Sequence, residues 1–238
     1  MPDGRHRGTR AGRVTRLSPA QMRNLIRAET RPIGLSFVSP LRIHGADEAV
    51  PLWQRTEERL GGEDIPPPFW AFAWAGGQGL ARWVLDHPAE VAGQDVLDFA
   101  SGCGVVGLAA ARVGAERVTC VDIDPLAGAA AEANAALNRL KLRVRTDEVV
   151  GRSRAEIGAP DLVLVGDVHY EREAAARMTP WFERLAGEGA RVLVGDPERT
   201  YFPHDRGWRE IARYDVPVPR DLEDRDTRSV GVFEVTSP

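Results

Sequence analysis

The sequence contains few cysteines, a single lysine and no long apolar run. Its 238 residues include two cysteines, Cys103 and Cys120, which are too few for a disulfide framework, so a reducing, cytoplasmic setting is expected. No apolar run approaches the ~18 residues that a membrane-spanning helix needs. The N-terminal residues also lack the apolar segment of a signal peptide. We therefore expect neither a membrane partner nor secretion.

The basic charge of the chain comes almost entirely from arginine. Lys141 is the only lysine among 31 basic residues, which face 35 acidic ones. The resulting net charge of −4 argues against a general nucleic-acid-binding surface, because such surfaces are basic. The histidines show no spacing typical of a metal site, so no metal is expected.

Composition divides the chain into three parts. Residues 1–17 are rich in arginine and glycine and are predicted to be a disordered arm, either a solvated tail or a basic docking arm. Residues 18–68 form an N-terminal extension that ends in three prolines, which no helix can continue. Residues 69–238 then alternate between strand and helix patterns. They begin with FWAFAWAGG, either a core segment or the wall of a ligand pocket.

The elements of the extension are short. Ser18 is a typical N-cap, and the proline behind it suits the first position of a helix. The predicted elements are a helix from Pro19 to about Glu29, a strand at 41–44 and a helix at 51–60.

The remaining residues predict an α/β fold of the Rossmann-like, doubly wound type. Strand and helix patterns alternate, which favours a parallel sheet with helices on both faces, and the last two strands have no helix between them and should pair antiparallel. The predicted strands are 95–99, 117–121, 142–146, 162–165, 191–194, 208–216 and 229–235, and the predicted helices are 80–85, 105–113, 126–137 and 171–185.

The strongest motif is a glycine-rich loop behind the first of these strands. Residues 96–107 read VLDFASGCGVVG, so Gly102, Gly104 and Gly107 satisfy G-x-G-x-x-G between a strand and a helix. Glycines let the backbone approach a ligand closely, and the helix N-terminus offers free N–H groups. Asp122, at the end of the next strand, is placed to accept hydrogen bonds from both ribose hydroxyls of a nucleotide cofactor.

Two cofactors suit this arrangement, NAD and S-adenosylmethionine (AdoMet), and the residues favour AdoMet. Asp98 lies four residues before Gly102, where a carboxylate can receive the methionine ammonium group but would repel the pyrophosphate of NAD. The alternative role of Asp98 is to cap the glycine turn. We expect Asp124 to be the N-cap of the next helix and Cys103 to be a small filler rather than a nucleophile.

A second constellation follows the buried strand 162–165, where the chain reads GDVHY at 166–170. Strand ends of this kind point into the active crevice, so Asp167 and Tyr170 should lie above the methyl donor. The pair suits an amine acceptor, because a carboxylate can orient the nitrogen and an aromatic ring can line its channel. One conflict is that a carboxylate also stabilises the ammonium form, which cannot attack.

Simpler roles exist for several of these residues. Asp167 is alternatively the N-cap of the following helix. His169 is expected to be a neutral filler or a surface imidazole rather than a general base. Asp196, behind the next strand, belongs either to a turn or to the border of the acceptor channel.

Longer stretches of the chain resemble the seven-β-strand (class I) lysine methyltransferases, and most closely those that act on the β-subunit of electron transfer flavoprotein. The resemblance runs from about Arg27 to Pro203 and then loosely through the C-terminal hairpin. Its most specific part is the proline-aromatic segment joined to Asp-x-x-Tyr. The segments that carry it are 26–32 (IRAETRP), 49–57 (AVPLWQRTE), 66–78 (PPPFWAFAWAGGQ), 98–104 (DFASGCG), 122–125 (DIDP), 167–170 (DVHY) and 195–197 (GDP).

The resemblance implies a seven-stranded sheet, AdoMet as cofactor and roles for individual residues. The chain departs from many methyltransferases at Ala100, where the first glycine of the loop is usual, which puts the turn geometry in question. The implied acceptor motif is Asp167 and Tyr170, and the implied cofactor-binding residues are Trp74, Gly102, Gly104, Asp122 and Gly166. We add Asp98 and Ile123 to the expected cofactor-binding residues.

The function that the resemblance implies is AdoMet-dependent methylation of a protein lysine, with the β-subunit of electron transfer flavoprotein as the favoured substrate. Residues 69–238 would then be the methyltransferase domain. The alternatives are a lysine of a ribosomal protein, a small-molecule N-methyltransferase, a non-catalytic AdoMet-binding module and an NAD-binding oxidoreductase. The acidic residues at 221–226 would be either an ordinary solvated loop or a contact for a basic substrate.

Overall fold

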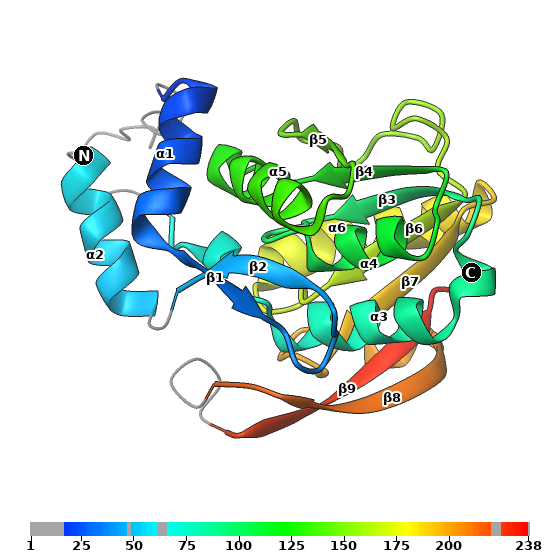
Figure 1. The fold of residues 1–238 in the computed structure, drawn as a ribbon. Helices are drawn as coiled ribbons and strands as arrows, with labels where there is room; N and C mark the ends of the chain where they lie inside the picture. The colour runs from blue at the N-terminus through cyan, green and yellow to red at the C-terminus, as the bar shows by residue number, and fades with distance from the viewer. Residues whose placement is uncertain (1–16, 47–48, 61–65, 220–224, 238) are drawn as a thin grey trace, which may run out of the picture.

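The computed structural model describes residues 17–46, 49–60, 66–219 and 225–237. Their central element is a seven-stranded sheet with the strand order β5-β4-β3-β6-β7-β9-β8 (Figure 1). The strands are β3 (Asp95–Phe99), β4 (Arg117–Val121), β5 (Arg143–Arg145), β6 (Leu162–Gly166), β7 (Arg191–Asp196), β8 (Arg209–Pro217) and β9 (Thr227–Glu234).

The topology is that of the predicted class I methyltransferase sheet. Strands β3 to β7 pair parallel, whereas β9 pairs antiparallel with both β7 and β8. All seven predicted strands are present with boundaries shifted by at most two residues, and the predicted C-terminal hairpin is confirmed.

Helices cover both faces of the sheet. Along β6, Leu162 and Leu164 pack on the side of α3 and α4, while Val163 and Val165 pack on the side of α6. This alternation buries apolar side chains on both faces, which explains the unbroken apolar run of the strand. The helices of this domain are α3 (Ala75–Asp86), α4 (Val105–Arg112), α5 (Pro125–Asn138) and α6 (Arg172–Gly187), with short 3-10 turns η3 (Pro88–Glu90) and η4 (His204–Arg206).

The N-terminal extension packs against α5 beside the sheet (Figure 1). Ser18 begins α1 with a capping box, as the sequence predicts, and Leu25 and Ile26 are buried against α5. Asn134 and Asn138 of α5 hydrogen-bond the backbone of β2, which fixes the extension to the domain. Its elements are α1 (Pro19–Glu29), β1 (Arg31–Gly34), β2 (Arg42–Gly45) and α2 (Ala49–Leu60), and the 3-10 turn η2 (Phe69–Ala71) follows the extension.

Two features of the described fold differ from the sequence-based expectation. Strand β1 was not predicted, because its four residues include a proline and are mostly exposed. Helix α3 begins at Ala75 rather than near residue 80, so Gly76 and Gly77 lie in its first turn. A Cβ atom on Gly76 would lie 2.3 Å from the carbonyl oxygen of Gly195, so glycine lets α3 approach β7 closely.

The arginine-rich residues 1–16 and the acidic residues 221–224 lie outside the described residues. Within the described ranges, no helix combines the length and apolar character needed to cross a bilayer. The same ranges contain no cluster of acidic, histidine and cysteine side chains arranged to hold a metal ion.

Ala100 adopts the left-handed conformation that glycine would favour, with φ of 51°. We expect Ala100→Gly to raise the free energy of unfolding by about 0.5–1 kcal/mol, because an exposed alanine in this region is strained. The control is Ala176→Gly on the exposed face of α6. This substitution should lower the free energy of unfolding by about 1 kcal/mol. Denaturant unfolding of both variants measures the two changes. Destabilisation by both substitutions would show that the Ala100 turn is unstrained.

Candidate active site

The site lies where the strand order reverses beside β3. The chain runs from β3 outward to β4 and β5, and then returns to β6 on the other side of β3. Loops that follow β3, β4 and β6 therefore meet at one edge of the sheet, which is where doubly wound sheets bind ligands. These loops contain the glycine motif, Asp122, and the segment from Asp167 to Tyr170.

The glycine loop forms an open backbone turn at this edge. Gly102 and Gly104 have φ of 51° and 74°, and Gly104 is the N-cap residue of α4. The Gly104 N–H donates to the carbonyl of Ser101 at 2.7 Å, which closes the turn. No atom lies within 4 Å of the point where a Cβ of Gly102 would stand, so that side of the loop is accessible to a ligand.

Asp122 anchors the glycine loop from the end of β4. Its carboxylate accepts hydrogen bonds from the N–H groups of Gly102 at 2.9 Å and Asp124 at 3.0 Å. Burial raises the pKa of Asp122, and burial raises that of Asp124 to about 6. Asp124 accepts from the N–H of Leu126 at 2.8 Å, so its predicted role as the N-cap of α5 is confirmed.

Asp98 lies beneath the loop rather than on its open side. The residue is 1% exposed, and one carboxylate oxygen accepts a hydrogen bond from the N–H of Gly107 at 2.8 Å. This contact corresponds to the capping role that the sequence left open for Asp98. Cys103 is buried, and burial raises the pKa of its thiol to about 12, which fits the predicted filler rather than a nucleophile.

Burial raises the pKa of Asp98 to about 7, which predicts a pH dependence of stability. Between about pH 4 and 7 the folded state holds a proton that the unfolded state has lost, so the free energy of unfolding should fall by about 3 kcal/mol as the pH rises through this range. Asp98→Asn, which does not titrate, should flatten this part of the profile. Denaturant unfolding at several pH values tests this, and equal slopes for both proteins would contradict it.

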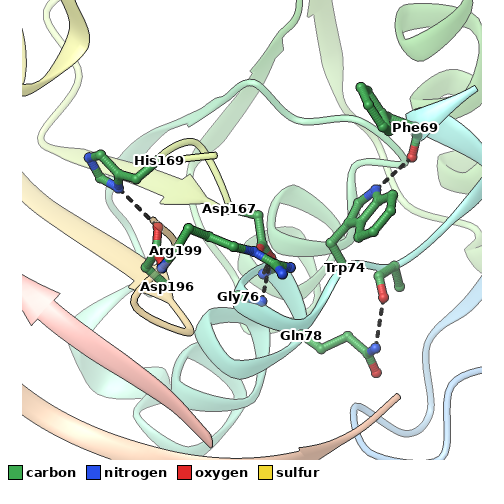
Figure 2. A network of polar contacts seen from close by, with 10 residues as sticks. Phe69, Trp74, Gly76, Gln78, Asp167, His169, Asp196 and Arg199 are labelled. Carbon is green, nitrogen blue, oxygen red and sulfur yellow. Dashed lines mark hydrogen bonds and ion pairs between the residues drawn. The ribbon is translucent and has the colours of Figure 1, made fainter. Parts of the chain in front are cut away.

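An aromatic wall stands beside the loops. The large apolar side chains exposed among the described residues are Phe69 at 43%, Tyr170 at 55% and Ile123 at 68%, and all three come from the segments that line this edge. The Phe69 ring packs edge-on against Trp74 at 5.6 Å and against Tyr170 at 5.8 Å. The Trp74 indole donates to the Phe69 carbonyl at 3.1 Å (Figure 2). Exposed aromatic groups gathered in this way are typical of a binding surface.

Asp167 is the most heavily hydrogen-bonded side chain of the site. One oxygen accepts from the N–H groups of Gly76 and of Gly77, the latter at 3.1 Å. The other oxygen accepts from Arg199, with Nε at 2.9 Å and Nη2 at 2.7 Å. Asp167 therefore caps the N-terminus of α3. The alternative that it caps the following helix is wrong, because Glu171 is the N-cap residue of α6.

Arg199 was missed by the sequence analysis, since nothing in the local pattern separates it from the other arginines. It lies in the loop behind β7, and its own N–H donates to Asp196 at 2.7 Å. Figure 2 shows its guanidinium group reaching across to Asp167 and the start of α3. The side chains of Arg199 and Asp167 are 18% and 10% exposed, so the pair is largely shielded from water.

His169 and Asp196 form a buried pair behind this contact. Both side chains are fully buried, and the His169 Nδ1 lies 2.9 Å from a carboxylate oxygen of Asp196. The ring is surrounded by Phe182, Phe202 and Trp208. The filler role of His169 therefore fits, and Asp196 does not border an acceptor channel, because its carboxylate points into the core.

Gly166 allows α3 to pack closely against the sheet. A Cβ atom at this position would lie 2.9 Å from the Cα of Gly77, so a side chain here would push the helix away. The two glycines behind Trp74 are thus a packing surface and a source of N–H groups for Asp167, rather than the pocket wall suggested by the sequence. The aromatic residues in front of them are the exposed part of this segment.

Comparisons with known proteins agree with this fold. Residues 84–163 match the family described as Ribosomal protein L11 methyltransferase (PrmA). A solved structure from Pyrococcus horikoshii, described as a putative RNA methyltransferase, superposes with a TM-score of 0.52 at 17% identity. The match covers 72% of this chain and 88% of that chain, and the two share the fold.

Several proteins found by sequence comparison are more similar to this chain than that solved structure is. The electron transfer flavoprotein beta subunit lysine methyltransferase of Mus musculus is 36% identical over 172 residues, which are 70% of this chain and 66% of the mouse protein. The chain thus spans slightly less than two thirds of that relative's length. The homolog from Caenorhabditis elegans is 30% identical over 177 residues, which are 69% of this chain and 71% of the nematode protein. The chain therefore belongs to the family of electron transfer flavoprotein beta subunit lysine methyltransferases.

Proposed function

We propose that the protein is an AdoMet-dependent protein-lysine N-methyltransferase that acts on the β-subunit of electron transfer flavoprotein. The observation that carries the proposal is the meeting of an open glycine loop and Asp122 with the Asp167–Tyr170 segment at adjacent strand ends. The glycine loop and Asp122 suit a nucleoside cofactor, and the Asp167–Tyr170 segment suits an amine acceptor. Membership of the family supports the same substrate class.

The residues present fit AdoMet. The free space above Gly102 suits a ligand that passes over the loop, and the exposed Ile123 offers an apolar surface beside Asp122 for an adenine ring. In the proposal, Asp122 accepts from the ribose hydroxyls, while Gly102, Gly104 and Gly166 shape the floor and Trp74 flanks the methionine part. Asp98 acts from beneath the loop, through the Gly107 N–H that it binds at the start of α4. When bound, AdoMet supplies an electrophilic methyl group.

The acceptor side of the proposed site is formed by Tyr170, Phe69 and Asp167. Tyr170 and Phe69 pack edge to face and form an exposed aromatic rim that suits the apolar stem of a lysine. Asp167 fixes the strand end beneath this rim. Catalysis would arise mainly from holding the amine in line with the methyl group, which is a contribution of orientation rather than of acid–base chemistry.

The domain division and the compartment belong to the same proposal. Residues 69–238 would form the methyltransferase domain, and the extension would shape the substrate-facing side through its contacts with α5. Cys103 and Cys120 are free and buried, which supports a reducing, cytoplasmic setting.

Labelling in a host lysate tests the substrate. The protein is incubated with labelled AdoMet and lysate, and the labelled bands are identified by mass spectrometry. We expect label on a lysine of the flavoprotein β-subunit. The match of residues 84–163 to a ribosomal-protein methyltransferase family favours a ribosomal-protein lysine as the second candidate. Label on a ribosomal protein and none on the flavoprotein would establish that alternative.

A further inference from the structure

The negative charge of the Asp167 carboxylate is neutralised by the groups that bind it. Its carboxylate offers about four acceptor positions. Two N–H groups of α3 and two N–H groups of Arg199 occupy them. The guanidinium group carries a full positive charge, and the N-terminus of α3 adds the partial positive charge of its helix dipole. The net local charge at Asp167 is therefore close to zero or slightly positive.

This arrangement resolves the conflict between a carboxylate and an attacking amine. A free carboxylate beside a lysine would raise the pKa of the amine and hold it as an unreactive ammonium. A carboxylate that is already paired with a guanidinium exerts little such attraction. Because its acceptor positions are occupied, Asp167 would position the acceptor segment rather than bind the amine itself.

We propose that Arg199 is a positioning residue that neutralises Asp167, so that the acceptor lysine enters the site as a neutral amine. This inference rests on the proposed lysine methyltransferase function. It deepens that function by assigning a residue that controls the protonation of the acceptor, from a loop that does not itself line the aromatic rim.

Other charged groups around the site are consistent with this role. Asp122 and Glu171 face Tyr170, whose pKa rises mainly through burial and also through these two carboxylates and Asp167. Two backbone N–H groups bind the Asp122 carboxylate, and Glu171 is exposed, so water screens its charge. Behind Arg199, Asp196 is paired with His169. Arg199 is thus a cation in direct contact with the Asp167 carboxylate.

The reaction balances with a proton released to water. The lysine ammonium loses its proton to solvent on entering the site. The nitrogen lone pair then forms the new C–N bond, and the C–S bond breaks with its electron pair remaining on sulfur. The products are a methyl-lysine ammonium and neutral S-adenosylhomocysteine, so two positive charges enter and two, the ammonium and the proton, leave.

The pH dependence of methyl transfer tests the role of Arg199. Initial rates of transfer to purified flavoprotein β-subunit are measured between about pH 6 and 10 for wild type, Arg199→Met and Arg199→Lys. At saturating acceptor, we expect Arg199→Met to move the acid limb of kcat up by about one pH unit, because kcat reports the pKa of the bound amine and an opposite charge at this range shifts a pKa by one unit or more. Activity near neutral pH would then fall about tenfold and recover in base. Arg199→Lys, which keeps the charge, should retain the wild-type limb.

The matched control is Arg154→Met. Arg154 pairs with Asp161 at the opposite end of β6, and its side chain is 26% exposed, similar to Arg199. We expect its pH profile to equal that of wild type. Should Arg199→Met lower the rate by the same factor at every pH, Arg199 would have only a structural role, and the inference would be overturned.

A second measurement does not depend on the stability of any variant. The acceptor lysine is labelled with ¹³C, and its pKa is measured by NMR when the wild-type protein is bound to the β-subunit and S-adenosylhomocysteine. We expect a value below that of the free acceptor, and a raised or unchanged value would refute the inference. Absence of any transfer by wild type would instead refute the proposed function, so the two failures are distinguishable.

Discussion

Asp167→Ala is expected to lower methyl transfer at least a hundredfold while the affinity for S-adenosylhomocysteine changes by no more than about threefold. The substitution removes the group that fixes both the acceptor segment and the first turn of α3. Misplacement of a reacting group by about 1 Å is enough for a loss of this size. The hydrogen bonds of Asp167 described above run to α3 and to Arg199, so we expect the cofactor side to be preserved. Single-turnover rates and calorimetric titration measure the two effects.

The same variant should also be less stable, because Arg199 loses its described carboxylate partner in a largely shielded place. We expect the free energy of unfolding to fall by about 2 kcal/mol, less than for a fully buried pair because water still reaches Arg199. Asp167→Asn keeps the shape and one acceptor oxygen for α3 and is the matched control. Full turnover by Asp167→Ala would show that the acceptor site lies elsewhere.

Asp122→Ala is expected to weaken binding of S-adenosylhomocysteine about a hundredfold. Two hydrogen bonds from ribose hydroxyls to an ionised carboxylate would be lost, and each contributes about 1.5–3 kcal/mol. The loop would also lose the contact from Gly102 to Asp122 that holds its open turn. Water can replace part of the lost hydrogen bonding to the ribose. The expected loss of affinity is therefore near a hundredfold rather than larger. Calorimetry with S-adenosylhomocysteine measures it without any acceptor.

The control for Asp122 is Asp161→Ala. Asp161 is an exposed carboxylate paired with Arg154 just before β6, at the end of the sheet opposite to the site. Its removal should leave ligand affinity unchanged. Equal affinities of wild type and Asp122→Ala would show that the ribose is held by other groups.

Much of the fold follows from local patterns in the sequence. The apolar run of β6 predicts a strand buried on both faces, and each side chain packs as that pattern requires. Asp124 before Pro125 predicts the N-cap of α5, because the spacing places its carboxylate on the N–H of Leu126. Signals of this kind depend on neighbouring residues alone and are therefore visible in one sequence.

The features that sequence did not predict depend on contacts between distant segments. Gly76 and Gly77 look like a loop because glycine is a poor helix former, yet Gly76 packs against β7 and Gly77 against β6 within α3. Arg199 reaches Asp167 across 32 positions of the chain. The burial of Asp98 beneath the loop, which sets its pKa, likewise arises only in the folded protein.

The scarcity of lysine has a structural consequence. A lysine methyltransferase with one lysine offers almost no acceptor of its own. Lys141 is exposed and lies just before β5, which pairs parallel with β4. It therefore stands at the end of the sheet opposite to the proposed active site, out of reach of its own molecule. Methylation of Lys141 would require a second copy of the protein.

The proposed function is the transfer of a methyl group from AdoMet to a lysine of the electron transfer flavoprotein β-subunit. Mass spectrometry of purified β-subunit after incubation with the protein and AdoMet tests this proposal. We expect methylated lysine on the β-subunit with wild type, at least a hundredfold less with Asp167→Ala at matched times, and less with Asp122→Ala when AdoMet is limiting. An unmodified β-subunit after incubation with wild-type protein that binds S-adenosylhomocysteine would contradict it.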